Sequence, residues 1–322
     1  MLIVSEDPRL GWYDDKAPVS VARAAQKLGA VVTTMPVGAP GNDPYPKVQA
    51  AILEHDCTIY FARLGDQDRF TAPAAGRRTV MSYARTIDEI ESAFGTTTHG
   101  AMQALKLGID QTFELGGEVV ITCSRGTRLI GQLPQAPERL EDDGSQRRFP
   151  LGVHSPILAD TFSGQVALAH FLTPTGSKVY EPASVALGGT TMVHVENGRI
   201  TGYDGNPQTV TAIQNHYRRV ADQFDIDPRA VHSFHAGIHP ACAYGEPAAA
   251  NPDRWSNTVF CNPRFVHFHT CGAYPPAEIC WMVLDPTITL NGGAIWKDGR
   301  LLLDALDVAH SNLHQWPELP KR

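Results

Sequence analysis

The 322-residue chain contains no apolar run of about 18 residues, the length that a membrane-spanning helix requires. It opens with MLIVSEDPRL, whose apolar stretch is shorter than the core of a secretory signal. Lysine and arginine never occur in a run longer than two residues, and the formal net charge is −7, so the basic face that binds nucleic acids is missing. We therefore expect a cytoplasmic protein whose partners include neither a membrane nor a nucleic acid.

Several motifs of common cofactor and catalytic sites are also missing. The six cysteines form no C-x-x-C pair, which argues against a zinc ribbon and for reduced thiols. No G-x-G-x-x-G follows the first apolar segment and no G-x-x-x-x-G-K-[ST] occurs, so a dinucleotide or P-loop nucleotide site has no support. The G-x-S-x-G nucleophile elbow is absent too. The sequence therefore indicates neither an organic cofactor nor a serine hydrolase built on such an elbow.

The composition is that of a folded protein, with 43% hydrophobic and 19% charged residues, and the length suits two domains. Residues 1–115 alternate short β-branched segments with segments of helical periodicity, such as PVSVARAAQKLGA at 18–30. Thr86 and Glu89 form a capping-box pattern at the start of another helix. We expect an α/β domain with a mainly parallel sheet, serving as a scaffold or an oligomerisation surface.

Residues 116–322 show a different pattern. Their apolar and β-branched segments are separated by Gly, Pro and Asn, with hairpin-type turns at ENGR (196–199) and NGG (291–293). One clear helix is predicted at 207–224, where PQTVTAIQNHYRRVADQF carries an apolar stripe. This pattern predicts an α+β domain that is rich in antiparallel strands.

One polar stretch of the first domain, FARLGDQDRF at 61–70, follows an expected strand. Loops after the strands of α/β sheets often bind ligands. The stretch contains two arginines and two aspartates, Arg63, Asp66, Asp68 and Arg69. We favour a solvated loop over a ligand-binding one.

Metal-binding residue types are concentrated in two stretches, HSFHAGIHP (232–240) and HFHTCGAYPPAEIC (267–280). In a strand, alternate residues share a face, so His267 and His269 are expected to point the same way. They form either a ligand pair or two hydrogen-bonded histidines in a polar pocket. The glycine and proline of the earlier stretch predict a loop on the rim of a sheet.

Glu278 stands between the turn-forming AYPPA and the apolar ICWMVL, with no Lys or Arg within ten residues on either side. A buried carboxylate needs a cation or a metal, so this setting favours a metal ligand. Cys271 and Cys280 are more simply explained as small buried apolar residues than as soft ligands. Two histidines with one carboxylate suit non-haem Fe(II), while zinc hydrolases use similar ligands, so the residues leave both metals open.

Five stretches resemble one known group of enzymes. They are VITCSRGTRLIGQL (120–133), TPTGSKVYEP (173–182), VENGRITGYDG (195–205), HAGIHP (235–240) and DPTITLNGGAIWKDGRLL (285–302). The chain resembles the group that contains the aminopeptidase T-like metallopeptidases and the 2,5-dihydroxypyridine 5,6-dioxygenases of nicotinate catabolism.

The resemblance carries an expectation for one ligand. In that group, the element matching HAGIHP begins with a metal ligand, which is Glu in the peptidases and His in the dioxygenases. His235 is the dioxygenase choice. The group also has an H-x-D metal pair, and this chain departs from it, because Glu278-Ile279-Cys280 stand at the matching positions.

We therefore expect 116–322 to be the catalytic domain of an enzyme with one divalent metal, acting on a small aromatic or N-heterocyclic acid. Fe(II)- and O₂-dependent ring opening is favoured; Zn or Mn is the alternative metal. The alternative function is a metal-dependent hydrolase, whether aminopeptidase-like, amidohydrolase or aromatic deaminase, and the third is a non-enzymatic small-molecule binding module. A homo-oligomer is expected. The expected ligands are His235, His269 and Glu278. His267 is expected as a further ligand or as a catalytic acid–base group, and His239 and His232 as groups that orient ligands or move protons.

Overall fold

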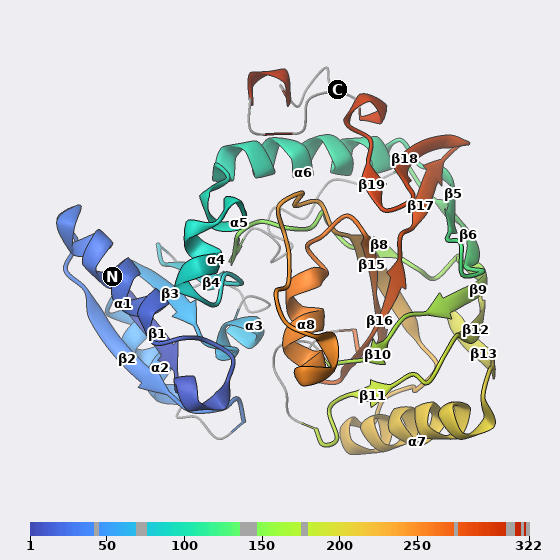
Figure 1. The fold of residues 1–322 in the computed structure, drawn as a ribbon, viewed down its shortest axis with the longest axis horizontal. Helices are drawn as coiled ribbons and strands as arrows, with labels where there is room; N and C mark the ends of the chain where they lie inside the picture. Colours follow the sequence, from blue (N-terminus) through green and yellow to red (C-terminus); the bar gives the residue numbers. More distant parts are fainter. Residues whose placement is uncertain are drawn as a thin grey trace. The chain divides into compact units, whose positions relative to one another are not determined.

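The computed structural model describes residues 1–41, 45–68, 76–135, 147–174, 180–273, 276–306, 313–316 and 319. Within them the chain forms two compact units (Figure 1). Unit 1 comprises residues 1–97 and 147–151, and unit 2 comprises the other described residues. The expected division after residue 115 lies at the C-terminal end of a helix, α6 (His99–Glu114), that belongs to unit 2.

Unit 1 is built on a parallel sheet in the order β2-β1-β3-β4-β7. Its strands are β1 (Leu2–Glu6), β2 (Thr33–Val37), β3 (Cys57–Phe61), β4 (Arg78–Ser82) and β7 (Arg148–Phe149). Its helices are α1 (Lys16–Lys27), α2 (Tyr45–Leu53), α3 (Leu64–Asp68), α4 (Ile87–Glu91) and α5 (Ala93–Thr96). The expectation of an α/β domain with a parallel sheet is confirmed.

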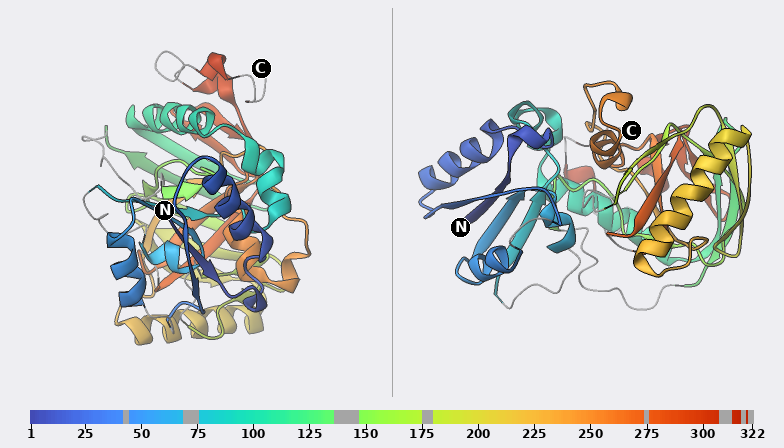
Figure 2. Two further views of the ribbon diagram at one scale, coloured as in Figure 1. Left: turned by 90° about the vertical axis from the view of Figure 1, so that its left-hand side faces the viewer. Right: turned by 90° about the horizontal axis from the view of Figure 1, so that it is seen from below.

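The strand order explains where the helices of unit 1 lie. The chain crosses from β1 outward to β2 and then back past β1 to β3. Because crossovers between parallel strands are right-handed, two crossovers in opposite directions place α1 and α2 on opposite faces of the sheet. The right-hand view of Figure 2 shows this arrangement. At α4, Thr86 Oγ1 accepts a hydrogen bond from the Glu89 N–H at 3.2 Å, and the Glu89 carboxylate accepts one from the Thr86 N–H, so the predicted capping box is present.

Unit 2 contains a large antiparallel sheet in the order β13-β12-β9-β6-β5-β17-β18-β19. Its strands are β5 (Gly117–Thr122), β6 (Arg128–Leu133), β9 (Ser163–Leu168), β12 (Thr191–Glu196), β13 (Arg199–Asp204), β17 (Thr287–Leu290), β18 (Gly293–Lys297) and β19 (Arg300–Leu301). Asn197-Gly198 and Asn291-Gly292 all have positive φ, as the two-residue hairpin turns predicted at these positions require. The expectation of a unit rich in antiparallel strands is confirmed.

A smaller antiparallel sheet, in the order β16-β15-β14-β8, carries most of the candidate site residues that the sequence singled out. Its strands are β8 (Ile157–Leu158), β14 (Val231–Ala236), β15 (Phe265–Cys271) and β16 (Glu278–Leu284). All of β15 is buried, as is all of β16 but its last residue. A short pair, β10 (Phe171–Leu172) with β11 (Val185–Ala186), completes the described strands.

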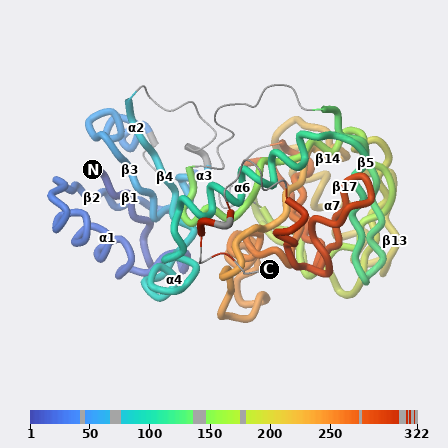
Figure 3. The backbone as a smooth tube through the Cα atoms, turned by 90° about the horizontal axis from the view of Figure 1, so that it is seen from above, coloured from blue at the N-terminus to red at the C-terminus, as the bar shows by residue number. Residues whose placement is uncertain are grey.

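The helices of unit 2 differ in how well the sequence predicted them. Helix α7 (Pro207–Phe224) has the predicted bounds and begins with Asn206, whose side chain accepts from two backbone N–H groups. Glycine often ends a helix, yet α6 continues past Gly108 to Glu114, and Figure 3 shows α6 as one continuous helix. Helix α8 (Pro252–Val259) was not predicted. Across the residues that the structure describes, each helix is too short or too polar to cross a membrane.

The smaller sheet has one apolar face. Phe234, Phe268 and Trp281 lie directly opposite one another on adjacent strands, with ring centroids 5.3 and 5.7 Å apart. Tyr217 of α7 joins this face, because its hydroxyl accepts from Trp281 Nε1–H and is hydrogen-bonded to the Thr270 hydroxyl, each at 2.5 Å. Since side chains alternate along a strand, this packing fixes which residues of β14, β15 and β16 point to the other face.

Candidate metal centre

Strand register brings the chemistry-bearing residues to the second face of the smaller sheet. His235 lies opposite His267 across β14 and β15, and His269 lies opposite Cys280 across β15 and β16. Directly opposed residues share a face, and so do residues two apart on one strand. The set on this face therefore includes His235, His267, His269, Glu278 and Cys280, together with Cys271 at the end of β15.

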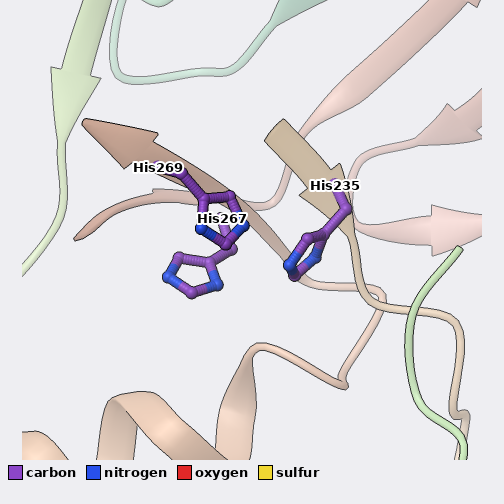
Figure 4. Close-up of side chains that lie close together, drawn as sticks. All are labelled: His235, His267 and His269. Carbon is purple, nitrogen blue, oxygen red and sulfur yellow. The ribbon is translucent and has the colours of Figure 1, made fainter. Parts of the chain in front are cut away.

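Three imidazole rings converge on this face (Figure 4). The ring centroids of His235, His267 and His269 are between 4.8 and 5.1 Å apart. One ligand atom from each ring lies within 4.8 Å of the others. The three residues are only 3, 5 and 7% exposed, respectively. Histidine nitrogens in such an arrangement can hold one metal ion.

Glu278 is joined to the cluster through His269. His269 Nδ1 and Glu278 Oε1 are 2.5 Å apart, and the glutamate is 1% exposed. His269, Glu278 and Cys280 form a second group whose ligand atoms lie within 4.8 Å of one another. His269 therefore belongs to both groups.

The donor atoms fit a cation. Among the described residues, His269 Nε2 and Glu278 Oε2 are buried and have no hydrogen-bond partner. Buried polar atoms are nearly always satisfied, so an unsatisfied lone pair beside two further imidazoles is a typical place for a metal ion. Burial raises the pKa of the Cys271 thiol, which lies at the end of β15, to about 12, so this cysteine is a neutral thiol near pH 7.

His232 and His239 lie outside both groups of ligand-type side chains in the described residues. The His232 ring is partly buried, and its Nε2–H donates to the Cys271 carbonyl at 2.9 Å. His239 is fully buried, and its Nδ1 accepts from the Ala241 N–H at 3.3 Å. Both rings therefore bind backbone groups, and the partner of His232 lies on β15, two residues after His269.

The expectation that 232–240 forms a loop was wrong for 232–236, and it holds only for 238–240, which lie outside the strands and helices. Residues Val231–Ala236 are a strand between β8 and β15. Gly237 is needed for a close approach rather than for a loop, because a Cβ there would lie 2.2 Å from the Asn262 carbonyl oxygen. His235 is thus held by a buried strand.

His154 is a neighbour that the sequence did not single out. Its Nε2 accepts from the Ala236 N–H at 2.9 Å, so its proton is on Nδ1, which donates to the Ser155 carbonyl at 2.7 Å. Its ring centroid lies 6.4 Å from that of His235. Phe260, at the end of α8, packs its ring 5.8 Å from His235 and 5.5 Å from His267. A lone histidine and a lone phenylalanine give no sequence signal for this placement.

The polar stretch of unit 1 is not the solvated loop that we expected. Arg63 is 4% exposed and its guanidinium lies 2.5 Å from Glu6 Oε1. Asp66 is 1% exposed and accepts a hydrogen bond from the Tyr83 hydroxyl. Asp68 is the last residue of α3, and Arg69 lies outside the described residues. Arg63 and Asp66 therefore take part in a buried network.

Comparison with known proteins supports the fold. No protein-family model and no curated protein matches the sequence. Among solved structures, the chain is similar to 2,5-dihydroxypyridine dioxygenase from Pseudomonas putida KT2440, with a TM-score of 0.63 and 15% identity over 94% of this chain and 91% of that chain. The chain therefore shares the fold of a dioxygenase from the group that the sequence resembles, and no match supports the metallopeptidase branch.

Proposed function

We propose that unit 2 is a mononuclear metal enzyme in which His235, His267 and His269 bind one divalent ion. The observation that carries this proposal is the convergence of three buried imidazoles, each offering a ligand atom within 4.8 Å of the others. The set differs from the sequence-based one in one member, since His267 takes the place of Glu278. Strand pairing explains this choice, because His235 and His267 are directly opposed.

The reaction that we propose is Fe(II)- and O₂-dependent opening of the ring of a small aromatic or N-heterocyclic acid. Two observations support it, namely the imidazole donor set, which suits iron, and the fold shared with a 2,5-dihydroxypyridine dioxygenase. When bound, such an ion supplies a Lewis acid and a redox centre with open coordination positions.

Three parts of the chain have roles in this proposal. The buried strands β14 and β15 hold the ligands rigidly. Phe260 gives the site an apolar wall beside two of the histidines, which excludes water and suits a flat ring. His232 and His239, expected as catalytic or orienting groups, are assigned to orientation because the ring of each is held by a backbone group and lies outside the two ligand groups. The homo-oligomer and the cytoplasmic location stay predictions from the sequence.

Metal-dependent hydrolysis is the second candidate function. One observation favours it, namely that three histidines without a carboxylate also form a catalytic zinc set. Zinc or manganese would then activate water on an amide or an aromatic amine. This candidate predicts turnover in the absence of O₂.

Metal analysis of the full chain, purified without added metal under anaerobic conditions, separates these functions. We expect about one iron per chain, and O₂ uptake with hydroxylated pyridine or benzoate acids as test substrates. Zinc or manganese with turnover in the absence of O₂ would favour hydrolysis. His194→Ala, which removes a histidine outside the cluster, is the matched control and should keep its metal content. His194 lies on β12 and is paired with Asp204 at the surface. Wild-type protein that binds no added Fe(II), Zn(II) or Mn(II) would overturn the metal centre and leave a small-molecule binding module.

A further inference from the structure

The contact between His269 and Glu278 is a diagonal one across two strands. Cys280 lies directly opposite His269, and Glu278 is two residues away on the same face. The two side chains meet at 2.5 Å between Nδ1 and Oε1. An ionised carboxylate has only acceptor oxygens, so the shared proton belongs to the imidazole nitrogen. His269 therefore donates through Nδ1 to Glu278.

This hydrogen bond decides which nitrogen of His269 can bind a metal. A neutral imidazole with its proton on Nδ1 has its lone pair on Nε2, and the partner of one nitrogen sets the role of the other. His269 Nε2 is buried and has no hydrogen-bond partner among the described residues. It is therefore the ligand atom that His269 can offer alongside His235 and His267.

The charge of Glu278 points the same way. Its residue exposure is 1%, and His269 is the one side chain, among those described, that hydrogen-bonds or ion-pairs with its carboxylate. Burying a lone carboxylate is costly unless a positive charge compensates it. A divalent ion on Nε2 of the same ring would supply that charge across the imidazole.

We propose that Glu278 is a positioning residue for the metal centre and not a ligand. It fixes the tautomer and the orientation of His269, so that Nε2 faces the other two imidazoles. This inference rests on the three-histidine centre proposed above. It assigns a role to the carboxylate that the sequence placed among the ligands, and it leaves Cys280 as a buried neighbour.

Two variants of Glu278 test this role with Co²⁺ as the probe. Glu278→Gln keeps an oxygen that can accept from Nδ1–H, whereas Glu278→Ala removes every acceptor. Partners that orient a ligand typically contribute 10–100-fold to metal affinity. The apoprotein of Glu278→Ala should therefore bind Co²⁺ about 10–100-fold more weakly than the wild type, and Glu278→Gln should lose less affinity than Glu278→Ala. The visible spectrum of bound Co²⁺ should be unchanged in both, because the ligands are the same. Glu196→Gln, an exposed glutamate of β12, is the matched control.

Two results would overturn the inference. If Glu278→Gln loses Co²⁺ binding as fully as His267→Ala, or changes the spectrum of bound Co²⁺, Glu278 is a ligand. If both Glu278 variants bind Co²⁺ as tightly as the wild type, Glu278 has no role in the centre.

A second measurement reads the tautomer directly and needs no change at Glu278. In ¹⁵N spectra of histidine-labelled wild-type apoprotein, with His269 assigned by comparison with His269→Gln, the proton of His269 should be on Nδ1. A proton on Nε2 would contradict the inference even if the variants fail to fold. In Glu278→Ala the fixed Nδ1–H form should be lost, which a merely structural glutamate would not cause.

Failure of the metal centre would look different. In that case, His235→Ala and His267→Ala would bind Co²⁺ as the wild type does. If those variants lose Co²⁺ and the Glu278 variants do not, only the positioning role is wrong.

Discussion

The two units bury polar side chains in contrasting ways. In unit 1, the Arg63 guanidinium is held by Glu6 and lies over the Trp12 ring at 4.5 Å, while Arg85 lies over the same ring at 4.7 Å. In unit 2, the face of the smaller sheet that carries His235, His267 and His269, called the histidine face below, brings lone pairs together. Those of His269 Nε2 and Glu278 Oε2 meet no hydrogen-bond donor in the described part of the chain. Buried charges that bind one another stabilise or specify a fold. Lone pairs that converge without a hydrogen-bond partner indicate a binding site.

The largest effect on stability is expected from breaking the unit 1 network. Arg63→Ala leaves the Glu6 carboxylate, 2% exposed, without its guanidinium. Removing one partner of a buried ion pair costs about 3–5 kcal/mol of unfolding free energy. Chemical denaturation measures the loss, and Arg77→Ala is the control, since Arg77 pairs with Asp56 at the surface and should cost about 0–1 kcal/mol. Equal losses in the two variants would contradict this view of Arg63.

Breaking the histidine face should instead remove metal. His267→Ala deletes one of three proposed ligands, so metal affinity should fall by more than about 100-fold, the upper range for outer partners, and turnover should fall with it. Metal content after dialysis and circular dichroism measure the two sides, and secondary structure should persist. Full metal occupancy in His267→Ala would return the ligand set to the one expected from the sequence, with Glu278 in it.

Unit 2 also contains a buried histidine that lies outside the two ligand groups, His216 of α7. Burial, followed by the nearby Arg219 charge, lowers its pKa from 6.5 to about 4. The unfolded chain therefore takes up a proton first as the pH falls, and stability that is fully present above pH 6.5 is lost between pH 6.5 and 4. The slope is at most about 1.4 kcal/mol per pH unit. His216→Gln should flatten the unfolding free energy over this range, and an unchanged slope would show that another group causes the loss.

The smallest effect is expected at the start of α4 in unit 1. Thr86→Ala removes the hydroxyl that accepts from the Glu89 N–H and should cost about 1 kcal/mol of unfolding free energy. Thermal unfolding should shift slightly downward while metal content per chain stays constant. A loss of metal in this variant would contradict the view that metal binding does not depend on the start of α4 in unit 1.

Local patterns predicted much of the fold. The apolar stripe of α7, the capping box at Thr86 and the Asn-Gly turns are short-range signals, and the structure contains all of them. Helix α8 escaped prediction because its eight residues span barely two turns. Gly108 is a residue type that often ends helices, yet it is buried inside α6, where packing overrides its low helix propensity.

The candidate site was predictable only in part, because strand register is a tertiary property. Alternation along one strand was enough to place His267 and His269 on one face. That His235 lies opposite His267, and Glu278 diagonal to His269, depends on how three strands pair. A residue such as His154 acts through a backbone contact to Ala236, and no spacing rule announces it.

The sheet of unit 1 is not complete when its first stretch of chain ends. Its edge strand β7 is Arg148–Phe149, which comes after β5 and β6 of the other unit in the sequence. Arg148 also lays its guanidinium over the Tyr83 ring at 4.9 Å. During synthesis, the ribosome must therefore deliver the chain through residue 149 before unit 1 can close its edge. A gene fragment cut at residue 115 would encode a sheet without its edge strand.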